Sequence, residues 1–208
     1  MKNFKLRIGI TMRVTEADNY YEKRDAIAQD WSEYLYSAFS DAQWMFIPNI
    51  GNRVVDYVEK WDLNAFVLSG GEDIGRSPDR DVTERAIFDY AIKNTIPLLG
   101  ICRGLQAIYL WSGGKYSTHS AEFERLHVAK KHKILINNSV REVNSYHQNK
   151  LDENSLPKTL KILATCVNDK SIEAVTGENI LAMMWHPERE KSEQTWELEL
   201  IKKHLKMD

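Results

Sequence analysis

The sequence predicts an α/β protein in which a mostly parallel central sheet carries helices on both faces. In the first half of the chain, short apolar runs alternate with segments whose apolar residues recur at helical spacing. The second half changes to short strand-like runs separated by turns rich in Asn and Asp, which predicts an antiparallel appendage. The 208 residues contain no internal repeat, linker or low-complexity tract, so we expect a single domain over residues 1–208.

The first half is expected to alternate four strands with four helices. Residues 24–39 are predicted to be helical because apolar residues such as Trp31 and Ala38 recur on one face. The third helix is expected to open at Asp81, with Asp81 or Thr83 as its N-cap. In chain order, the expected strands are 6–11, 44–48, 65–69 and 96–101, and the expected helices are 24–39, 54–61, 81–93 and 105–111.

The second half is expected to supply five short strands and a closing helix. Because the strand-like runs follow one another through short polar turns, we expect them to pair in antiparallel fashion. The closing helix is predicted over residues 192–205, with Trp196, Leu200 and Leu205 facing inward. The expected strands are 133–136, 140–143, 160–164, 171–175 and 180–185.

Composition excludes several functional classes. The formal net charge of −2 gives no basic footprint for nucleic acid. No apolar run approaches the roughly 20 residues that cross a membrane, and the N-terminus shows no signal-peptide pattern. The six histidines lack tight ligand spacing, so we expect no metal and no cofactor, and we expect His119, His127 and His132 at the surface. Cys102 and Cys166 cannot build a disulfide framework, which favours a cytoplasmic setting, and Cys166 is expected in the core.

Cys102 is the clearest candidate for chemistry. It follows an apolar run, precedes helix-forming residues, and has Gly100 and Gly104 two positions to either side. This layout is typical of a nucleophile elbow, in which a strand turns sharply into a helix and exposes a reactive side chain. The positive end of the following helix would favour the thiolate. The alternative is a buried cysteine that ends a core strand.

Two further polar features end expected strands, at the edge of the sheet where ligands bind in such folds. Gly70 and Gly71 could let backbone N–H groups approach a substrate closely, as an oxyanion hole requires. The alternative is an ordinary turn. His186 and Glu188 could supply the base and the orienting carboxylate that a cysteine nucleophile needs, if the last strand lies beside the elbow strand. The alternative is a structural histidine.

Five motifs taken together resemble a known family. They are residues 69–74, Arg80-Asp81 with Glu84, residues 100–106, residues 144–148 and residues 185–188. The chain resembles class I glutamine amidotransferase-type domains, and more narrowly their gamma-glutamyl hydrolase and peptidase C26 branch. The resemblance spans nearly the whole chain and implies a flavodoxin-like three-layer α/β sandwich.

The resemblance also implies an activity, the cysteine-dependent hydrolysis of a γ-glutamyl amide through a γ-glutamyl thioester, with release of glutamate. In this reading Cys102 is the nucleophile, His186 the base and Glu188 the group that orients it. The backbone N–H groups of Gly71 and Arg103 would form the oxyanion hole.

Further residues of these motifs are implied to hold the small-molecule substrate. Gln106, Tyr146 and His147 fall where such enzymes bind the glutamyl moiety. Gly70 and Glu72 adjoin the expected oxyanion hole and are candidates for the same task.

The triad does not identify the group that leaves with the nitrogen. Ammonia would make the chain a glutaminase that feeds a partner synthetase, whereas a substituted amine would make it a stand-alone hydrolase. A non-catalytic protein that retains the fold is a third class, which the intact triad disfavours. Arg13 and Arg24 could bind a phosphate, and Tyr20 or Tyr21 could stack on a base. The alternative for this segment is a solvated helix start.

Residues 9–13, followed by residues 20–25, resemble the gamma-glutamyl-CDP-amidate hydrolases. This resemblance implies cytidine diphosphoramidate as the product and a place in the phosphoramidate decoration of surface or capsule polysaccharide. Two departures from the gamma-glutamyl-GABA hydrolases, the compact region 115–133 and Lys170 in place of glycine, argue against a polyamine-pathway substrate.

Overall fold

The computed structural model describes residues 6–118, 120–190 and 195–206. The strands are β1 (Arg7–Thr11), β2 (Arg13–Glu16), β3 (Lys23–Ala26), β4 (Gln43–Ile47), β5 (Ala65–Leu68), β6 (Leu98–Ile101), β7 (Tyr116–Ser117), β8 (Val128–Ile136), β9 (Ser139–Tyr146), β10 (Lys150–Leu151), β11 (Lys161–Cys166), β12 (Ile172–Thr176) and β13 (Ile180–Met183). The helices are α1 (Gln29–Ala38), α2 (Val54–Lys60), α3 (Pro78–Asn94), α4 (Arg103–Trp111), α5 (Ala121–His127) and α6 (Thr195–His204).

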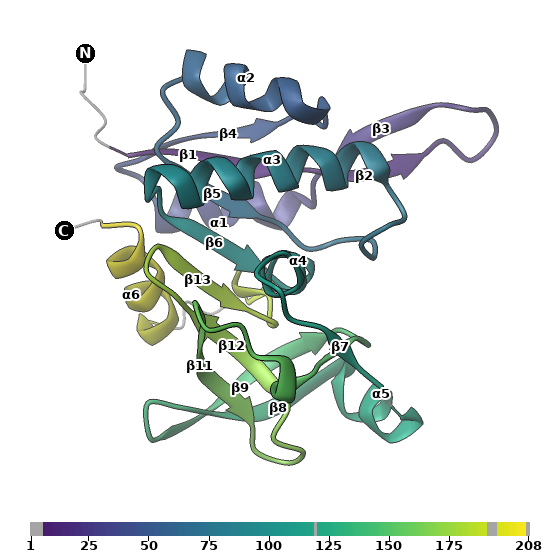
Figure 1. Cartoon of the computed structure of the whole chain (residues 1–208), viewed down its shortest axis with the longest axis vertical. Coiled ribbons are helices and arrows are strands. Elements are labelled where there is room, and N and C mark those ends of the chain that lie inside the picture. Colours follow the sequence, from purple (N-terminus) through teal and green to yellow (C-terminus); the bar gives the residue numbers. More distant parts are fainter. Residues whose placement is uncertain (1–5, 119, 191–194, 207–208) are drawn as a thin grey trace.

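Within the described residues, nine strands form one mixed sheet in the order β4-β1-β5-β6-β13-β12-β11-β8-β9. The strands from β4 to β13 run parallel to their neighbours. The pairs from β13 to β9 are antiparallel. Figure 1 shows the parallel half in the upper part of the view and the antiparallel half below it. The predicted α/β fold is confirmed, and the antiparallel strands continue the central sheet itself.

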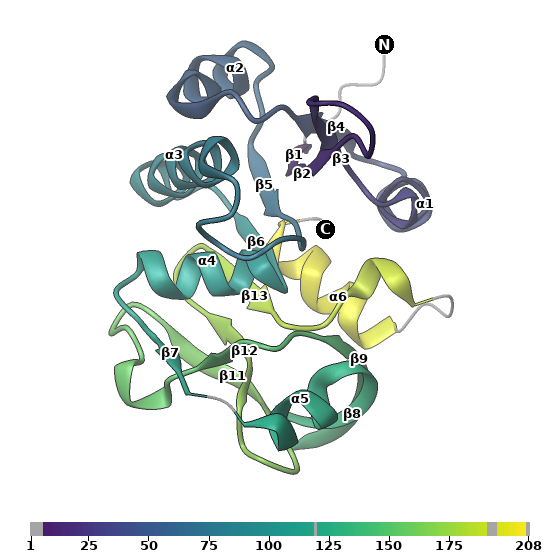
Figure 2. The ribbon, with the colours of Figure 1, turned by 90° about the vertical axis from the view of Figure 1, so that its right-hand side faces the viewer.

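Helices cover both faces of the parallel half, which gives the three predicted layers (Figure 2). On one face, Val58 of α2, Ile87 of α3 and Ile108 of α4 belong to one buried apolar cluster. On the other face, Leu35 of α1 and Ile201 of α6 belong to a second cluster. Each face of the sheet therefore has its own core, and removal of these side chains from water stabilises the fold.

The parallel half brings the candidate residues to one edge of the sheet. β5, β6 and β13 are consecutive parallel neighbours, so their carboxyl ends lie on the same side. The register pairs Ile101 with Met183. Cys102 follows the first of these residues directly, and the chain reaches His186 shortly after the second. Gly70 follows the neighbouring strand β5, so all three features meet at this edge.

The prediction of a helix over residues 24–39 is wrong in its first part. Lys23–Ala26 forms β3, which pairs with β2 in an antiparallel hairpin, and α1 begins after it. Asp25 anchors this hairpin because its carboxylate accepts hydrogen bonds from the backbone and side-chain N–H groups of Asn49. The helical spacing begins only near Trp31, whose side chain is buried against the sheet.

Helix α3 begins at Pro78 rather than at Asp81. Proline suits the first helical position because its missing N–H would have no partner there. Ser77 occupies the cap position that was predicted for Asp81 or Thr83. The Asp81 carboxylate instead accepts a hydrogen bond from the backbone N–H of Gly75, in the loop before the helix.

Two further element starts near the candidate residues differ from the prediction. α4 begins at Arg103 because Cys102 itself occupies the cap position. β8 begins at Val128, which places His132 inside the sheet. The predicted start of the closing helix at Ser192 lies outside the described residues. In the part of the chain that the structure describes, no helix is long and apolar enough to span a membrane.

The expectation of surface histidines is wrong for the two that the structure describes. His127 is fully buried at the end of α5, and His132 is only 8% exposed on β8. His119 lies outside the described residues. From Lys131 onward, exposed and buried residues alternate along β8, so Lys131 and Lys133 lie on the face opposite to His132. Cys166 is buried, as predicted.

Candidate functional site

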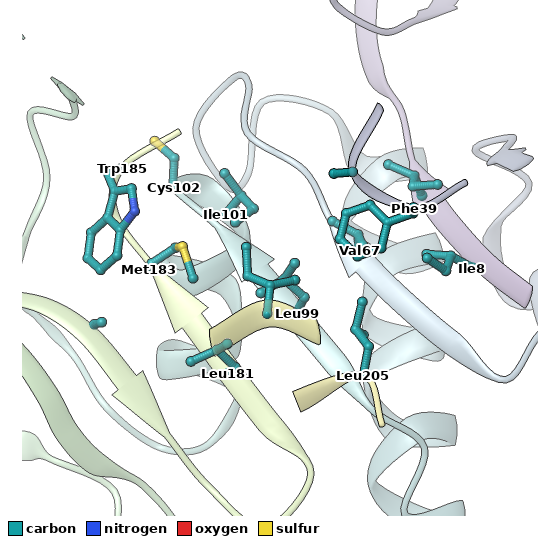
Figure 3. Packing of buried hydrophobic residues seen from close by; sticks show 14 of the residues in the cluster. Ile8, Phe39, Val67, Leu99, Ile101, Cys102, Leu181, Met183, Trp185 and Leu205 are labelled. Carbon is teal, nitrogen blue, oxygen red and sulfur yellow. The ribbon is translucent and has the colours of Figure 1, made fainter. Parts of the chain in front are cut away.

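Cys102 lies in the sharp turn that joins β6 to α4. Its φ of 51° and ψ of −102° are values that L residues rarely adopt. The flanking glycines are required by space. A Cβ on Gly104 would lie 2.0 Å from the carbonyl oxygen of Leu68, and a Cβ on Gly100 would lie 2.8 Å from the carbonyl carbon of Gly104. Figure 3 shows Cys102 at the end of the apolar layer, beside Trp185. This is the strained strand-to-helix turn that the two glycines predict.

His186 is held between Cys102 and Glu188. The His186 Nδ1 lies 2.7 Å from the Glu188 Oε1. Burial opposes the charged ring, but the nearby Cys102 thiol and Glu188 carboxylate outweigh it and raise the pKa of His186 to about 9. The ring is therefore positively charged at neutral pH. A thiol, an imidazole and a carboxylate in this order are the groups that nucleophilic thiol catalysis requires.

Asn144 fixes the backbone of His186, a contact that the sequence did not reveal. Its side-chain amide donates a hydrogen bond to the His186 carbonyl oxygen and accepts one from the His186 backbone N–H, each at 2.8 Å. The available signal was an asparagine directly after a strand-like run, where this residue is unfavourable unless its amide finds partners. β9 thus reaches across and holds the loop that carries the histidine.

The Gly70–Gly71 turn fits between the histidine and a buried arginine. A Cβ on Gly70 would lie 2.7 Å from the Cε1 atom of His186, and a Cβ on Gly71 would lie 2.4 Å from the Nη1 atom of Arg80. Gly71 also has a φ of 146°, which favours glycine. The backbone of this turn therefore lies directly beside the Cys102–His186 pair, where only glycine fits.

A buried ionic network joins this turn to α4. Arg80 donates hydrogen bonds to the carbonyl oxygens of Ser69 at 2.9 Å and Gly70 at 3.1 Å, and it pairs with Glu84 at 2.8 Å. Glu84 also pairs with Arg103 at the start of α4. Burial opposes the charge of Glu84, but the two guanidinium groups outweigh it and hold the pKa of Glu84 below its usual value. The network fixes the glycine turn relative to the elbow, a role that the motif alone did not show.

Two predicted substrate contacts, Glu72 and Gln106, are engaged inside the protein. The Glu72 carboxylate accepts a hydrogen bond from the Val14 backbone N–H at 3.2 Å and pairs with Arg80 at 2.8 Å. Gln106 is buried, and its side-chain oxygen accepts a hydrogen bond from the Tyr116 hydroxyl at 3.0 Å. Glu72 thus anchors the β2–β3 hairpin, and contact of either residue with substrate stays a prediction.

Tyr146 and His147 are neighbours at the end of β9 with different surroundings. The ring centres of Tyr146 and His186 lie 5.6 Å apart, and the guanidinium carbon of Arg189 lies 4.6 Å from the centre of the Tyr146 ring. His147 is buried, and its Nε2 lies 3.1 Å from the Nδ1 of His127. The structure therefore brings Tyr146 to the histidine of the site and places His147 in a separate buried cluster.

The segment after β1 is a hairpin and not a helix start. At its base, the Cβ of Arg13 lies 3.1 Å from where a Cβ on Gly71 would stand. Figure 1 shows the β2–β3 hairpin projecting from the body of the molecule. Further along it, the Arg24 guanidinium donates a hydrogen bond to the Tyr20 hydroxyl at 2.5 Å, and Tyr21 is 87% exposed. The structure thus brings Arg13 to the edge of the site and leaves the other candidates farther out.

A groove of about 740 Å³ opens on the other flank of the site. Its lining includes Tyr146 and three cationic side chains, those of Lys130, Lys131 and Arg189. Glu190 also lines it and pairs with Lys131 at 3.2 Å. The groove is therefore basic on balance and continuous with the tyrosine that contacts His186.

The sequence matches known proteins over most of its length. The model of the Peptidase C26 family matches residues 8–188. The chain is 33% identical over 195 residues to the gamma-glutamyl-CDP-amidate hydrolase of Campylobacter jejuni, covering 88% of this chain and 90% of that protein. It is 30% identical over 132 residues to a subunit of the glutamine-hydrolysing GMP synthase of Methanocaldococcus jannaschii, covering 61% of this chain and 65% of that protein.

Solved structures share the fold. A protein of Thermoplasma acidophilum described as a GMP synthase subunit superposes with a TM-score of 0.67 at 19% identity, covering 97% of this chain and 93% of the other. A glutamine amidotransferase of Thermotoga maritima gives a TM-score of 0.60 at 13% identity, with coverages of 97% and 84%. At these identities the likeness concerns the fold alone, and it confirms the predicted class I glutamine amidotransferase-type architecture.

Proposed function

The chain belongs to the Peptidase C26 family, and we propose that it hydrolyses γ-glutamyl amides with Cys102, His186 and Glu188 as its catalytic triad. One observation carries the proposal. The His186 ring lies 2.7 Å from the Glu188 carboxylate, and the Cys102 thiol is near enough to the ring to help raise its pKa to about 9. The elbow and the glycine turn add a strained nucleophile position and a backbone surface beside it.

The proposed reaction proceeds by acyl transfer. The Cys102 sulfur forms a bond to the γ-carbonyl carbon, and the electron pair of the carbonyl moves to its oxygen. The C–N bond then breaks while the His186 imidazolium donates its proton to the leaving nitrogen. Water, deprotonated by the neutral ring, adds to the thioester. The C–S bond breaks, which releases glutamate and restores the thiolate.

The oxyanion formed in each half of the reaction is assigned to the backbone N–H groups of Gly71 and Arg103. Arg103 is the first residue of α4, so its N–H has no partner within the helix. Gly71 lies in the turn that packs against His186 and is fixed by Arg80. The loss of one such donor typically costs about 100- to 1,000-fold in rate.

We further propose that the substrate is γ-glutamyl-CDP-amidate, with glutamate and cytidine diphosphoramidate as products. The likeness to the Campylobacter jejuni gamma-glutamyl-CDP-amidate hydrolase supports this choice. Arg13 stands at the edge of the site beside Gly71, where it can pair with a phosphate of the leaving group. The product would serve the phosphoramidate decoration of surface polysaccharide. Cys102 and Cys166 are free thiols, which supports a cytoplasmic setting.

A second candidate function is the release of ammonia from glutamine for a partner synthetase. The likeness to the Methanocaldococcus jannaschii GMP synthase chain favours it. Glutamate release by the purified chain from glutamine and from γ-glutamyl-CDP-amidate separates the two. We expect turnover of the nucleotide conjugate. Rapid hydrolysis of glutamine with none of the conjugate would overturn the proposed substrate and favour the glutaminase.

The mechanism is tested by Cys102→Ala, which should lower the rate more than about 1,000-fold. Cys166→Ala is the matched control, because it removes the other buried cysteine away from the triad. It should retain activity. Full activity in the Cys102→Ala variant would overturn the mechanism whatever the substrate.

The position of the leaving group is tested by Arg13→Ala, with Lys130→Ala as an exposed-cation control on the opposite flank. Arg13→Ala should raise KM for γ-glutamyl-CDP-amidate about 10-fold or more and leave KM for glutamine unchanged. If Lys130→Ala has the larger effect, the diphosphate lies in the basic groove instead of at the hairpin.

A further inference from the structure

A second cluster of chemically active side chains lies in the antiparallel half of the sheet. His127 ends α5, His147 follows β9, and Glu173 lies on β12. All three are at least 97% buried. None of them contacts Cys102, His186 or Glu188 in the hydrogen bonds and ion pairs of the described residues. Because these residues come from three separate segments, no short motif in the sequence announced the cluster.

Three potential ligand atoms converge at the centre of this cluster. The His127 Nδ1 lies 3.1 Å from the His147 Nε2 and 3.3 Å from the Glu173 Oε1, and the last two atoms lie 3.5 Å apart. A tetrahedral ion with bonds of about 2.0–2.1 Å holds its ligand atoms about 3.3–3.4 Å apart. The triangle therefore has the dimensions of one face of a tetrahedral metal site.

The outer nitrogens of both rings face acceptors, which sets the tautomer of each ring when it is neutral. The His127 Nε2 lies 3.1 Å from the Asp169 Oδ2, and the His147 Nδ1 lies 3.2 Å from the carbonyl oxygen of Asn149. A carboxylate and a carbonyl accept, so the ring N–H groups are on these outer nitrogens. The inner nitrogens of the neutral rings then point lone pairs at each other and at the Glu173 carboxylate. This is the arrangement in which protein histidines bind metals.

When both rings are neutral, three converging acceptors need a cation between them. A divalent ion would balance the charges of Glu173, which is fully buried, and Asp169, which is partly exposed. His132 points to the same centre from β8. Its Nε2 lies 3.3 Å from the Glu173 Oε2, and neither atom has a directed hydrogen-bond partner among the described residues. Unpartnered buried polar atoms of this kind call for an explanation.

We propose that His127, His147 and Glu173 bind a divalent transition metal ion, with Zn²⁺ the best match to a site of two imidazoles and one carboxylate. Asp169 and the Asn149 carbonyl orient the two rings. The ion ties α5, the end of β9 and β12 together. It thereby fixes the chain segment that continues from Tyr146, beside His186, to Asn149. This site is separate from the proposed reaction and does not depend on it.

The test is titration of the full chain with Zn²⁺ or Co²⁺ after removal of bound metal with a chelator. The Cys102→Ser background removes the thiol of the other site, which could bind Zn²⁺ by itself. We expect one equivalent to bind, with the absorption spectrum of tetrahedral Co²⁺. Glu173→Gln and His127→Gln should weaken binding at least roughly 100-fold, and Asp169→Asn should weaken it roughly 10- to 100-fold.

His204→Gln is the matched control. His204 hydrogen bonds with the Leu98 carbonyl oxygen on another part of the molecule, so its replacement should leave the affinity unchanged. A protonated His127 could bridge the same three atoms without a metal, and it predicts no saturable uptake. Absence of uptake, uptake that survives Glu173→Gln, or uptake lost in Cys102→Ser would each overturn the proposal. If replacement of a buried ligand unfolds the chain, Asp169→Asn still tests the proposal, because it leaves the three proposed metal ligands in place.

Discussion

Replacement of Glu188 by Gln tests the ion pair at the centre of the proposed active site. The amide keeps the shape of the side chain but removes the negative charge beside the His186 ring, to which the carboxylate lies at 2.7 Å. The pKa of His186 rises from 6.5 to about 9, which corresponds to about 3 kcal/mol in favour of the imidazolium. The nearby Cys102 thiol and Glu188 carboxylate are responsible for this rise. If Glu188 supplies about half of the effect, its charge raises the pKa of His186 by about one pH unit.

The alkaline limb of kcat/KM should therefore move from about pH 9 to about pH 8 in the Glu188→Gln variant. The limb moves down because His186 must donate a proton to the leaving nitrogen, and a ring with a lower pKa loses that proton sooner. The rate at neutral pH should also fall, by about 100- to 10,000-fold, because the ring loses the group that orients it. Glutamate release across the pH range measures both effects. Alkylation of Cys102 by iodoacetamide over the same range reports the thiolate without turnover.

Stability gives an independent reading of the same shift. The folded-state pKa of His186 lies above the unfolded value, so its contribution is fully present below pH 6.5 and is lost as pH rises through about 9. The wild type should therefore lose up to about 3 kcal/mol over this window, and Glu188→Gln should lose about half as much. Urea unfolding at several pH values measures the difference.

Glu190→Gln is the matched control. Its carboxylate accepts a hydrogen bond from Asn144 at 3.0 Å and pairs with Lys131, so it does not touch the His186 ring. This variant should keep the alkaline limb of the wild type. An unchanged limb and an unchanged alkylation profile in Glu188→Gln would show that Glu188 does not raise the pKa of His186.

Three further substitutions probe other parts of the fold. Gly70→Ala places a Cβ 2.7 Å from the His186 Cε1 and should lower kcat about 100-fold. Circular dichroism should show an intact fold. An unchanged kcat would show that the position of the His186 ring is not critical. Burial, reinforced by nearby carboxylates, raises the pKa of Glu197 to about 7, so the native state loses stability as pH rises from 4.5 through about 7. Glu197→Gln keeps an acceptor for the Trp185 indole N–H. In urea unfolding, this variant should be more stable than the wild type by up to about 3 kcal/mol near pH 8 and as stable as the wild type near pH 4. Lys170 has a φ of 61°, so Lys170→Gly should stabilise the protein by about 1 kcal/mol, and a loss of thermal stability would contradict this.

The elbow and the histidine loop could be predicted from the sequence because their constraints are local. Gly100 and Gly104 are required by contacts within one turn of chain and with the adjacent strand, so they remain visible as glycines. His186 and Glu188 contact each other across two residues. Patterns that span only a few residues therefore predict these local structures without knowledge of the rest of the fold.

The ionic network and the buried histidines depend on distant segments, so the sequence could not place them. Arg80 and Glu84 stand on one helical face, but their partners are the glycine turn and the start of α4. His132 lies in a stretch of lysines, and only the pairing of β8 in the sheet shows that this stretch has a buried face. The hairpin at Lys23–Ala26 was missed because its strands are short and polar and carry no apolar alternation.

The position of β13 has a consequence for how the molecule is assembled. β13 lies between β6 and β12, so it is the seam that joins the parallel strands to the antiparallel ones. During synthesis, Cys102 is made before β13, which is the last strand of the sheet in chain order. Until β13 pairs with β6 and β12, the parallel and antiparallel strands are not joined, and the Cys102 thiol has no His186 imidazole beside it. Completion of the sheet and arrival of the base are therefore one event, and an unfinished chain carries a cysteine without its partner.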